Sequence, residues 1–178
     1  MDFRRVFFDP QGRIAPRAFG QGYVLLTGAM LLVTVLSVVA SPGIGILQYA
    51  LVFPYICLFS KRLHDAGMSA WLWLVFLMGY FLVNLIASAI LMPLLAPETH
   101  EIQLEIQKVM EEGGLNAGME ELARRAPEIA QTSALVNVAV LLIASAIIGF
   151  AAYSLRSDPK PNRHGPPTLG GGRPDIRP

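Results

Sequence analysis

Two long stretches of this chain carry no charged side chain, one over residues 18–60 and one over 66–97. A soluble domain carries roughly one charged residue in four, whereas only 15% of this chain is charged. Uncharged stretches of that length are typical of helices that cross a lipid bilayer. The sequence therefore predicts an integral membrane protein.

Four apolar segments are long enough to cross the membrane. Each approaches or exceeds the roughly 20 residues that a helix needs to traverse about 30 Å of hydrocarbon. Lipid offers no hydrogen-bond partners to open strands, so helices are the form expected. The sequence thus predicts an all-α membrane protein with four transmembrane helices, at about 18–40, 44–60, 70–96 and 133–155.

Lysine and arginine fall mainly on one side of these predicted spans. They precede the first span, follow the second and follow the fourth, while the segment 97–132 is mostly acidic. Because cytoplasmic loops carry an excess of Lys and Arg, both termini and the joint at 61–69 are expected in the cytoplasm. The basic residues on that side are Arg4, Arg5, Arg13, Arg17, Lys61, Arg62, Arg156, Lys160, Arg163, Arg173 and Arg177.

The outer segment, 97–132, is predicted to form a short amphipathic helical insertion. Apolar residues recur at helical spacing on either side of Gly113 and Gly114, which break the run. The acidic polar faces favour two helices packed on each other over two helices on an anionic membrane surface. A solvated spacer and packing on a partner stay open. The two apolar stripes are Ile102, Ile106, Val109 and Met110, then Leu115, Met119, Leu122, Ala126 and Ile129.

The last segment, 157–178, is rich in proline and glycine and cannot bury a core of its own. We expect a cytoplasmic tail that is mostly disordered after Thr168, and docking of its first part stays open. Within the fourth span, Ser145 and Gly149 form a pair of small residues one turn apart, which permits close helix approach.

The joint between the second and third spans reads KRLHDAGMSAW, residues 61–71. Lys61 and Arg62 come at the end of a helix, where unpaired carbonyls favour a cation by about 0.3–1 kcal/mol. Gly67 can supply the left-handed turn that ends this helix. Ser69 is expected to cap the start of the next helix, and Trp71 suits the membrane interface. These residues fit a tightly specified cytoplasmic turn.

His64 and Asp65 are the residues that a simple turn explains least well. The carboxylate could orient the imidazole, or it could pair with Arg62, Arg13 or Arg17. The chain has no nucleophile elbow, no zinc-protease motif and no Gly-rich phosphate loop. Only His64 and His164 share the predicted cytoplasmic side, so no metal site is expected. No cofactor and no nucleic-acid partner are predicted, since no recognition module is present.

A cytoplasmic site for an anion is the sharper hypothesis. Arg13 and Arg17 have the spacing of one helical face, and Lys61, Arg62 and Arg163 could join them around a lipid phosphate. The alternative is that the same positive charge serves only to orient the protein in the membrane. The candidate binding residues are Arg13, Arg17, Lys61, Arg62, His64, Asp65 and Ser69.

Three elements, at residues 12–19, 61–71 and 161–167, resemble those of the bacterial inner-membrane family named domain of unknown function 805. The chain departs from the family pattern at Gly20, Ala70, Leu72 and His164, where tryptophan, glycine, tryptophan and tyrosine are usual. The resemblance implies a fold and a compartment, the inner membrane, but no reaction. It is carried by Gly12, Arg13, Arg17, Phe19, Arg62, Leu63, His64, Asp65, Gly67, Ser69, Trp71, Asn162, Gly165 and Pro166.

The sequence therefore favours a non-enzymatic envelope protein that binds anionic lipid or a partner through a cytoplasmic Arg/His/Asp cluster. The rival hypothesis is a small membrane enzyme or transporter that uses His64 and Asp65. Membrane lipids are the expected partners, and a homo-oligomer stays open.

Overall fold

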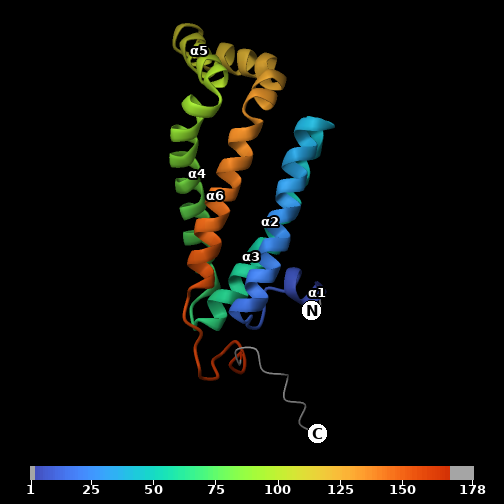
Figure 1. The fold of residues 1–178 in the computed structure, drawn as a ribbon. Helices are drawn as coiled ribbons and strands as arrows, with labels where there is room; N and C mark the ends of the chain where they lie inside the picture. The colour runs from blue at the N-terminus through green and yellow to red at the C-terminus, as the bar shows by residue number, and fades with distance from the viewer. Residues whose placement is uncertain (1–2, 169–178) are drawn as a thin grey trace. The chain divides into compact units, whose positions relative to one another are not determined.

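The computed structural model describes residues 3–168, apart from the side chain of Pro42. The disorder predicted after Thr168 falls on residues outside this range. The described chain is helical, with one isolated bridge between Asn162 and Gly165. Its elements are α1 (Phe3–Phe7), α2 (Pro16–Val39), η1 (Pro42–Ile46), α3 (Leu47–Asp65), η2 (Ala70–Leu72), α4 (Trp73–Leu95), α5 (Pro97–Thr132) and α6 (Ala134–Tyr153), where η denotes a 3-10 turn (Figure 1).

Four of the helical segments are long and apolar enough to cross a membrane, which confirms the predicted fold class. They are Pro16–Val39, Gly43–Asp65, Ala70–Leu95 and Ala134–Tyr153. The second segment continues past the predicted end at Ser60, through the charged residues of the joint. It can do so because these side chains find partners inside the protein, as described below.

The chain divides into two compact units. The first comprises residues 3–30, Ile46–Tyr80 and residues 145–168; the second comprises Leu31–Gly45 and Phe81–Ala144. We describe each by itself.

Aromatic side chains form the core of the first unit. Phe19 and Tyr23 lie one turn apart on α2 and stack with ring centroids 5.7 Å apart. Phe59 of α3 meets both rings edge-on, at 5.5 Å and 5.8 Å. Such geometries add about 0.5–1.5 kcal/mol per pair to the burial itself. Phe7 of α1 is also buried here, so this core fixes the start of α2 and α1 against the end of α3.

Two small residues one turn apart in α6, Ser145 and Gly149, explain how this helix approaches α2. The Tyr23 hydroxyl donates to the Ser145 carbonyl at 2.9 Å. A Cβ atom added to Gly149 would overlap the ring of Tyr23. The ring therefore lies directly over the glycine, and the predicted close approach at Ser145 and Gly149 is realised with an aromatic ring of α2.

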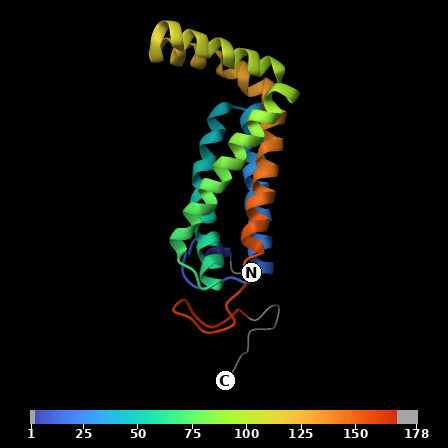
Figure 2. The same cartoon turned by 90° about the vertical axis from the view of Figure 1, so that its left-hand side faces the viewer.

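The second unit contains the helical insertion, α5. Its helix breaks at Gly114, whose φ of 81° and ψ of 175° are not helical, and the two arms run beside each other (Figure 2). Arg125 and Glu105 form an ion pair between the arms at 3.0 Å, and Thr99 and Thr132 share a hydrogen bond. Gly118 is buried, and its missing side chain leaves room for Met110. The arms form the hairpin that the sequence favoured.

The two apolar stripes of this hairpin differ in burial. The first apolar stripe does bury Ile102 and Ile106, but the second stripe leaves Leu115, Met119 and Leu122 exposed. The reason is that the second arm meets the first through the face that carries Gly118 and Arg125, beside the stripe and not on it.

The contact of Tyr23 with Gly149 gives a first prediction. Gly149→Ala should lower the free energy of unfolding by about 1–3 kcal/mol, because the added methyl group forces the buried ring to move. Thermal unfolding of the purified protein in detergent measures the effect. Gly28→Ala is the matched control, since nothing lies within 4 Å of the added atom. Equal melting temperatures for the Gly149→Ala variant and the wild type would contradict this packing.

Candidate functional site

The last two turns of α3 carry a set of buried polar side chains. The side chains of Arg62 and Asp65 are both 0% exposed. The helix ends after Asp65 with the Ala66 N–H donating to Arg62 and the Gly67 N–H donating to His64, at 3.2 Å and 3.1 Å. Gly67 has a φ of 74°, the left-handed conformation predicted to stop the helix. The helix end therefore fixes the backbone that presents these side chains.

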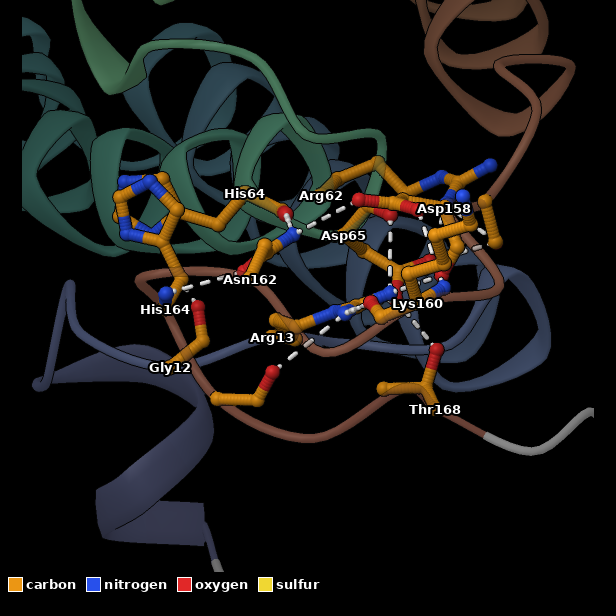
Figure 3. A network of polar contacts seen from close by, with 12 residues as sticks. Gly12, Arg13, Arg62, His64, Asp65, Asp158, Lys160, Asn162, His164 and Thr168 are labelled. Atoms are coloured by element: carbon orange, nitrogen blue, oxygen red, sulfur yellow. Dashed lines mark hydrogen bonds and ion pairs between the residues drawn. The ribbon is translucent and has the colours of Figure 1, made fainter.

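The Asp65 carboxylate lies at the centre of this cluster (Figure 3). Its Oδ1 accepts from Arg13 Nε at 3.1 Å and from the Thr168 hydroxyl. Its Oδ2 accepts from Arg62 Nη1 at 2.7 Å and from the Ser157 hydroxyl at 2.5 Å. A carboxylate has about four acceptor positions. All of them are therefore occupied by the protein.

Arg62 joins Asp65 to the end of α6. The carbonyls in the last turn of a helix lack their regular partners, and a cation there also interacts favourably with the helix dipole. Arg62 supplies both a charge and a set of donors at this end. Its five N–H groups have five acceptors: Ala152 O at 3.1 Å, Tyr153 O at 3.1 Å, Leu155 O, Asp65 Oδ2 and, at 3.2 Å, Ser157 Oγ.

Arg13 joins Asp65 to the segment after α6. Its side chain is only 2% exposed, although it comes from the loop before α2. Besides the Asp65 carboxylate, it reaches four backbone carbonyls, so its five N–H groups are also directed into the protein. These are Lys160 O at 2.9 Å, Asp158 O at 2.5 Å, Asp65 O at 3.2 Å and Gly165 O at 3.5 Å.

The structure brings together three of the predicted site residues, Arg13, Arg62 and Asp65, and places two others beside them. His64 Nδ1 lies 3.0 Å from the Gly12 carbonyl, and Lys61 Nζ donates to the Arg5 carbonyl. Both side chains are buried. We call the group Arg13, Arg62, Asp65, Ser157 and Thr168 the Asp65 network.

Arg17 is not part of the Asp65 network. The predicted shared face of Arg13 and Arg17 requires one helix through both residues, but α2 begins at Pro16 and leaves Arg13 in the preceding loop. Arg17 is exposed on the first turn of α2. Asp65 therefore pairs with Arg13 and Arg62, out of the three arginines considered from the sequence.

Ser69 also departs from its predicted role. It occupies the position before η2, but its side chain makes no capping hydrogen bond. The chain enters the third span through a 3-10 turn, in which the Leu72 N–H donates to the Ser69 carbonyl at 3.2 Å. The backbone of Ser69 thus provides the interaction expected of its hydroxyl.

The sequence pointed to Asn162 and Gly165 but did not predict the contacts that the segment after α6 makes. Ser157 and Thr168 bind the Asp65 carboxylate, and the Asp158 N–H donates to the Asp65 carbonyl at 2.7 Å. Asn162 Nδ2 donates to the His64 carbonyl at 3.1 Å. The motif PNRHGPP, residues 161–167, is the sequence signal that indicated this segment. Its Asn162 and Gly165 pair with each other, and a Gly165 φ of 130° allows the tight turn.

The arrangement can hold charge but offers little chemistry at Asp65. In the part of the chain that the structure describes, no buried side-chain nitrogen or oxygen lacks a hydrogen-bond partner. No group of three or more His, Cys, Asp or Glu side chains among residues 3–168 could hold a metal ion. Asp65 has no acceptor position left for a proton or a substrate. The network works as a clamp on three segments of the chain.

The fold and this clamp define a class: an all-α membrane protein with four apolar helices and a buried Arg/Asp cluster at the end of one of them. The family model described as "Protein of unknown function (DUF805)" matches residues 7–166. Since that match covers most of the chain, the protein belongs to this family, as its motifs suggested. No curated protein and no solved structure matches the chain.

The central position of Asp65 gives a second prediction. Asp65→Asn should lower the free energy of unfolding by about 3–5 kcal/mol, because two buried guanidinium groups lose their counter-charge. Thermal unfolding and yield of the purified protein in detergent report the loss. Asp158→Asn, in the same part of the protein, is the control. Asp158 contacts Arg13 and Asp65 through its backbone, and an asparagine oxygen can still accept from the Lys160 N–H, so this change should cost less than about 1 kcal/mol. Wild-type melting of Asp65→Asn would remove the clamp.

Proposed function

We propose that this protein is a non-enzymatic component of the bacterial inner membrane that binds anionic lipid at its cytoplasmic boundary. The observation that carries the proposal is that the arginines of the first unit differ in exposure and in where their donors point. Arg13 and Arg62 direct all their donors into the protein, whereas Arg4, Arg17 and Arg156 are exposed. Exposed guanidinium groups at this level attract phosphate head groups.

The exposed arginines lie where apolar helices begin or end. Arg17 is on the first turn of α2, Arg4 is on α1, and Arg156 follows α6 (Figure 1). Trp71, at the start of the third span, is 74% exposed. Tryptophan is enriched at the level of lipid head groups. The proposed lipid site thus differs from the first hypothesis: it uses Arg17 with Arg4 and Arg156, and it leaves Arg13 and Arg62 to the Asp65 network.

The orientation in the proposal rests on the distribution of Lys and Arg. An even number of spans puts both termini on one side, and the basic residues before α2, at the end of α3 and after α6 favour the cytoplasm for that side. The acidic hairpin α5 is then outside. The rival function, catalysis or transport through His64 and Asp65, gains no support from a carboxylate whose acceptor positions are all occupied.

The lipid proposal predicts a loss of anionic lipid without a loss of stability. Arg4→Gln with Arg17→Gln should weaken binding of phosphatidylglycerol roughly tenfold or more, since each basic side chain near the surface contributes about 1 kcal/mol. Binding of phosphatidylethanolamine should not change. Native mass spectrometry of protein released from vesicles of both lipids measures the retained share of each.

The matched control for this experiment is Lys108→Gln with Arg124→Gln, which removes the same charge from α5. That variant should retain the wild-type share of phosphatidylglycerol. The effect at Arg4 and Arg17 should also shrink in high salt, because screening acts over about 8 Å at physiological ionic strength. An unchanged anionic share in the folded Arg4/Arg17 variant would leave an acidic protein partner, or orientation alone, as the use of these arginines.

The proposed orientation can be tested by labelling. A cysteine at Asn116, exposed in α5, should react with a membrane-impermeant thiol reagent in intact cells, and a cysteine at Lys160 should react only after lysis. The native Cys57 is 0% exposed in α3 and should give no background. Labelling of Lys160→Cys in intact cells, with Asn116→Cys protected, would show the opposite orientation.

A further inference from the structure

Two histidines from distant parts of the chain stack on each other in the first unit. The ring centroids of His64 and His164 lie 3.6 Å apart, with 8° between the ring planes (Figure 3). His64 belongs to the last turn of α3, and His164 belongs to the turn between Asn162 and Gly165 that follows α6. The stack is therefore a contact between the membrane helices and the docked segment 157–168.

Hydrogen bonds determine where a proton can be added to this pair. His64 Nδ1 faces the Gly12 carbonyl at 3.0 Å, so this nitrogen carries a hydrogen. His164 Nε2 lies 3.0 Å from Arg163 Nε, whose N–H can only donate. His164 Nε2 must then be an unprotonated acceptor. A proton added to His164 Nε2 would point its N–H group at the N–H group of Arg163 Nε, and the hydrogen bond would be lost.

The charges around His164 also oppose a proton. Arg163 from its own segment, Arg13 from the loop before α2 and His64 from α3 all contribute positive or potentially positive charge. The nearby carboxylates are engaged elsewhere. Asp65 serves the two arginines of the network, and Asp158 accepts from Asn162 and Lys160. Burial, then these charges, hold the pKa of His164 below its ordinary value.

We propose that the His64–His164 stack is a pH-sensitive latch that holds segment 157–168 on the end of α3. Protonation of His164 breaks its bond with Arg163 and places a cation between Arg163, Arg13 and His64, so the segment detaches. Detachment removes Ser157 and Thr168 from the Asp65 carboxylate and removes three carbonyl acceptors, of Asp158, Lys160 and Gly165, from Arg13. A change of pH is thereby coupled to the opening of the Asp65 network.

The direction of the effect follows from linkage. A histidine in the detached segment has a pKa of about 6.5, and the docked form has a lower pKa. The detached state therefore binds protons more readily. Docking is fully favourable above about pH 6.5 and weakens as the pH falls through that value towards the pKa of the docked form.

The latch predicts a pH-dependent loss of protection in the docked segment. In neutral detergent without anionic lipid, hydrogen exchange of peptides from 157–168 should be followed by mass spectrometry from pH 8 to pH 5, corrected for the intrinsic rate. Protection in the wild-type protein should fall several-fold, up to roughly tenfold, on acidification, since one pKa unit corresponds to a tenfold change. Because no anionic lipid is present, the result is independent of the lipid proposal.

Three variants make the test specific. His164→Tyr keeps a flat ring for the stack but does not titrate in this range, so its protection should lose most of its dependence on pH. Arg163→Gln removes one opposing charge and should reduce the pH dependence, which keeps the test valid if His164→Tyr docks poorly. His100→Asn, which removes the histidine of α5, should behave as the wild type. Protection that is independent of pH in the wild type, or a full acid response in His164→Tyr, would overturn the latch.

Discussion

The interaction on which the first unit depends is the bond between the Asp65 carboxylate and two guanidinium groups. Burying an ion costs several kcal/mol unless a counter-charge and further hydrogen bonds replace its water. Asp65 meets that condition with Arg13, Arg62, Ser157 and Thr168. The three segments that supply these residues lie far apart in sequence. One carboxylate thus fixes the loop before α2 and the segment after α6 to the end of α3.

The two units are stabilised by different means. In the first, Arg62 satisfies both a buried carboxylate and the last carbonyls of α6, so the ends of two helices depend on one side chain. In the second, the ion pair of Arg125 with Glu105 joins the arms of α5, and its carboxylate is exposed. Exposed pairs contribute about 0–1 kcal/mol. The shape of the hairpin therefore depends more on Gly114, which reverses the chain, and on Gly118, which lets Met110 approach.

Sequence patterns predicted the features that depend on periodic or neighbouring residues, and they did not predict the contacts between residues far apart in the sequence. Apolar length gave the four spans, and Gly67 marked the end of α3, because both signals lie in a few adjacent residues. The sequence left three arginines open as partners of Asp65, and two of them, Arg13 and Arg62, pair with it. The prediction that Arg13 and Arg17 share one helical face was wrong, because α2 begins at Pro16, between the two residues. Ser157 and Thr168 gave no signal, since single hydroxyl groups in a proline-rich segment have no period and their partner is far away in the sequence.

The choice of basic residue at each position follows from the number of donors required. Arg62 and Arg13 each donate to five acceptors, which a guanidinium group with five N–H donors can satisfy and an ammonium group with three donors cannot. Lys61 lies next to Arg62 on α3, and its amine donates to the Arg5 carbonyl, a contact that ties α1 to α3. The Asp65 network therefore needs a guanidinium group, and not an ammonium group, at positions 13 and 62.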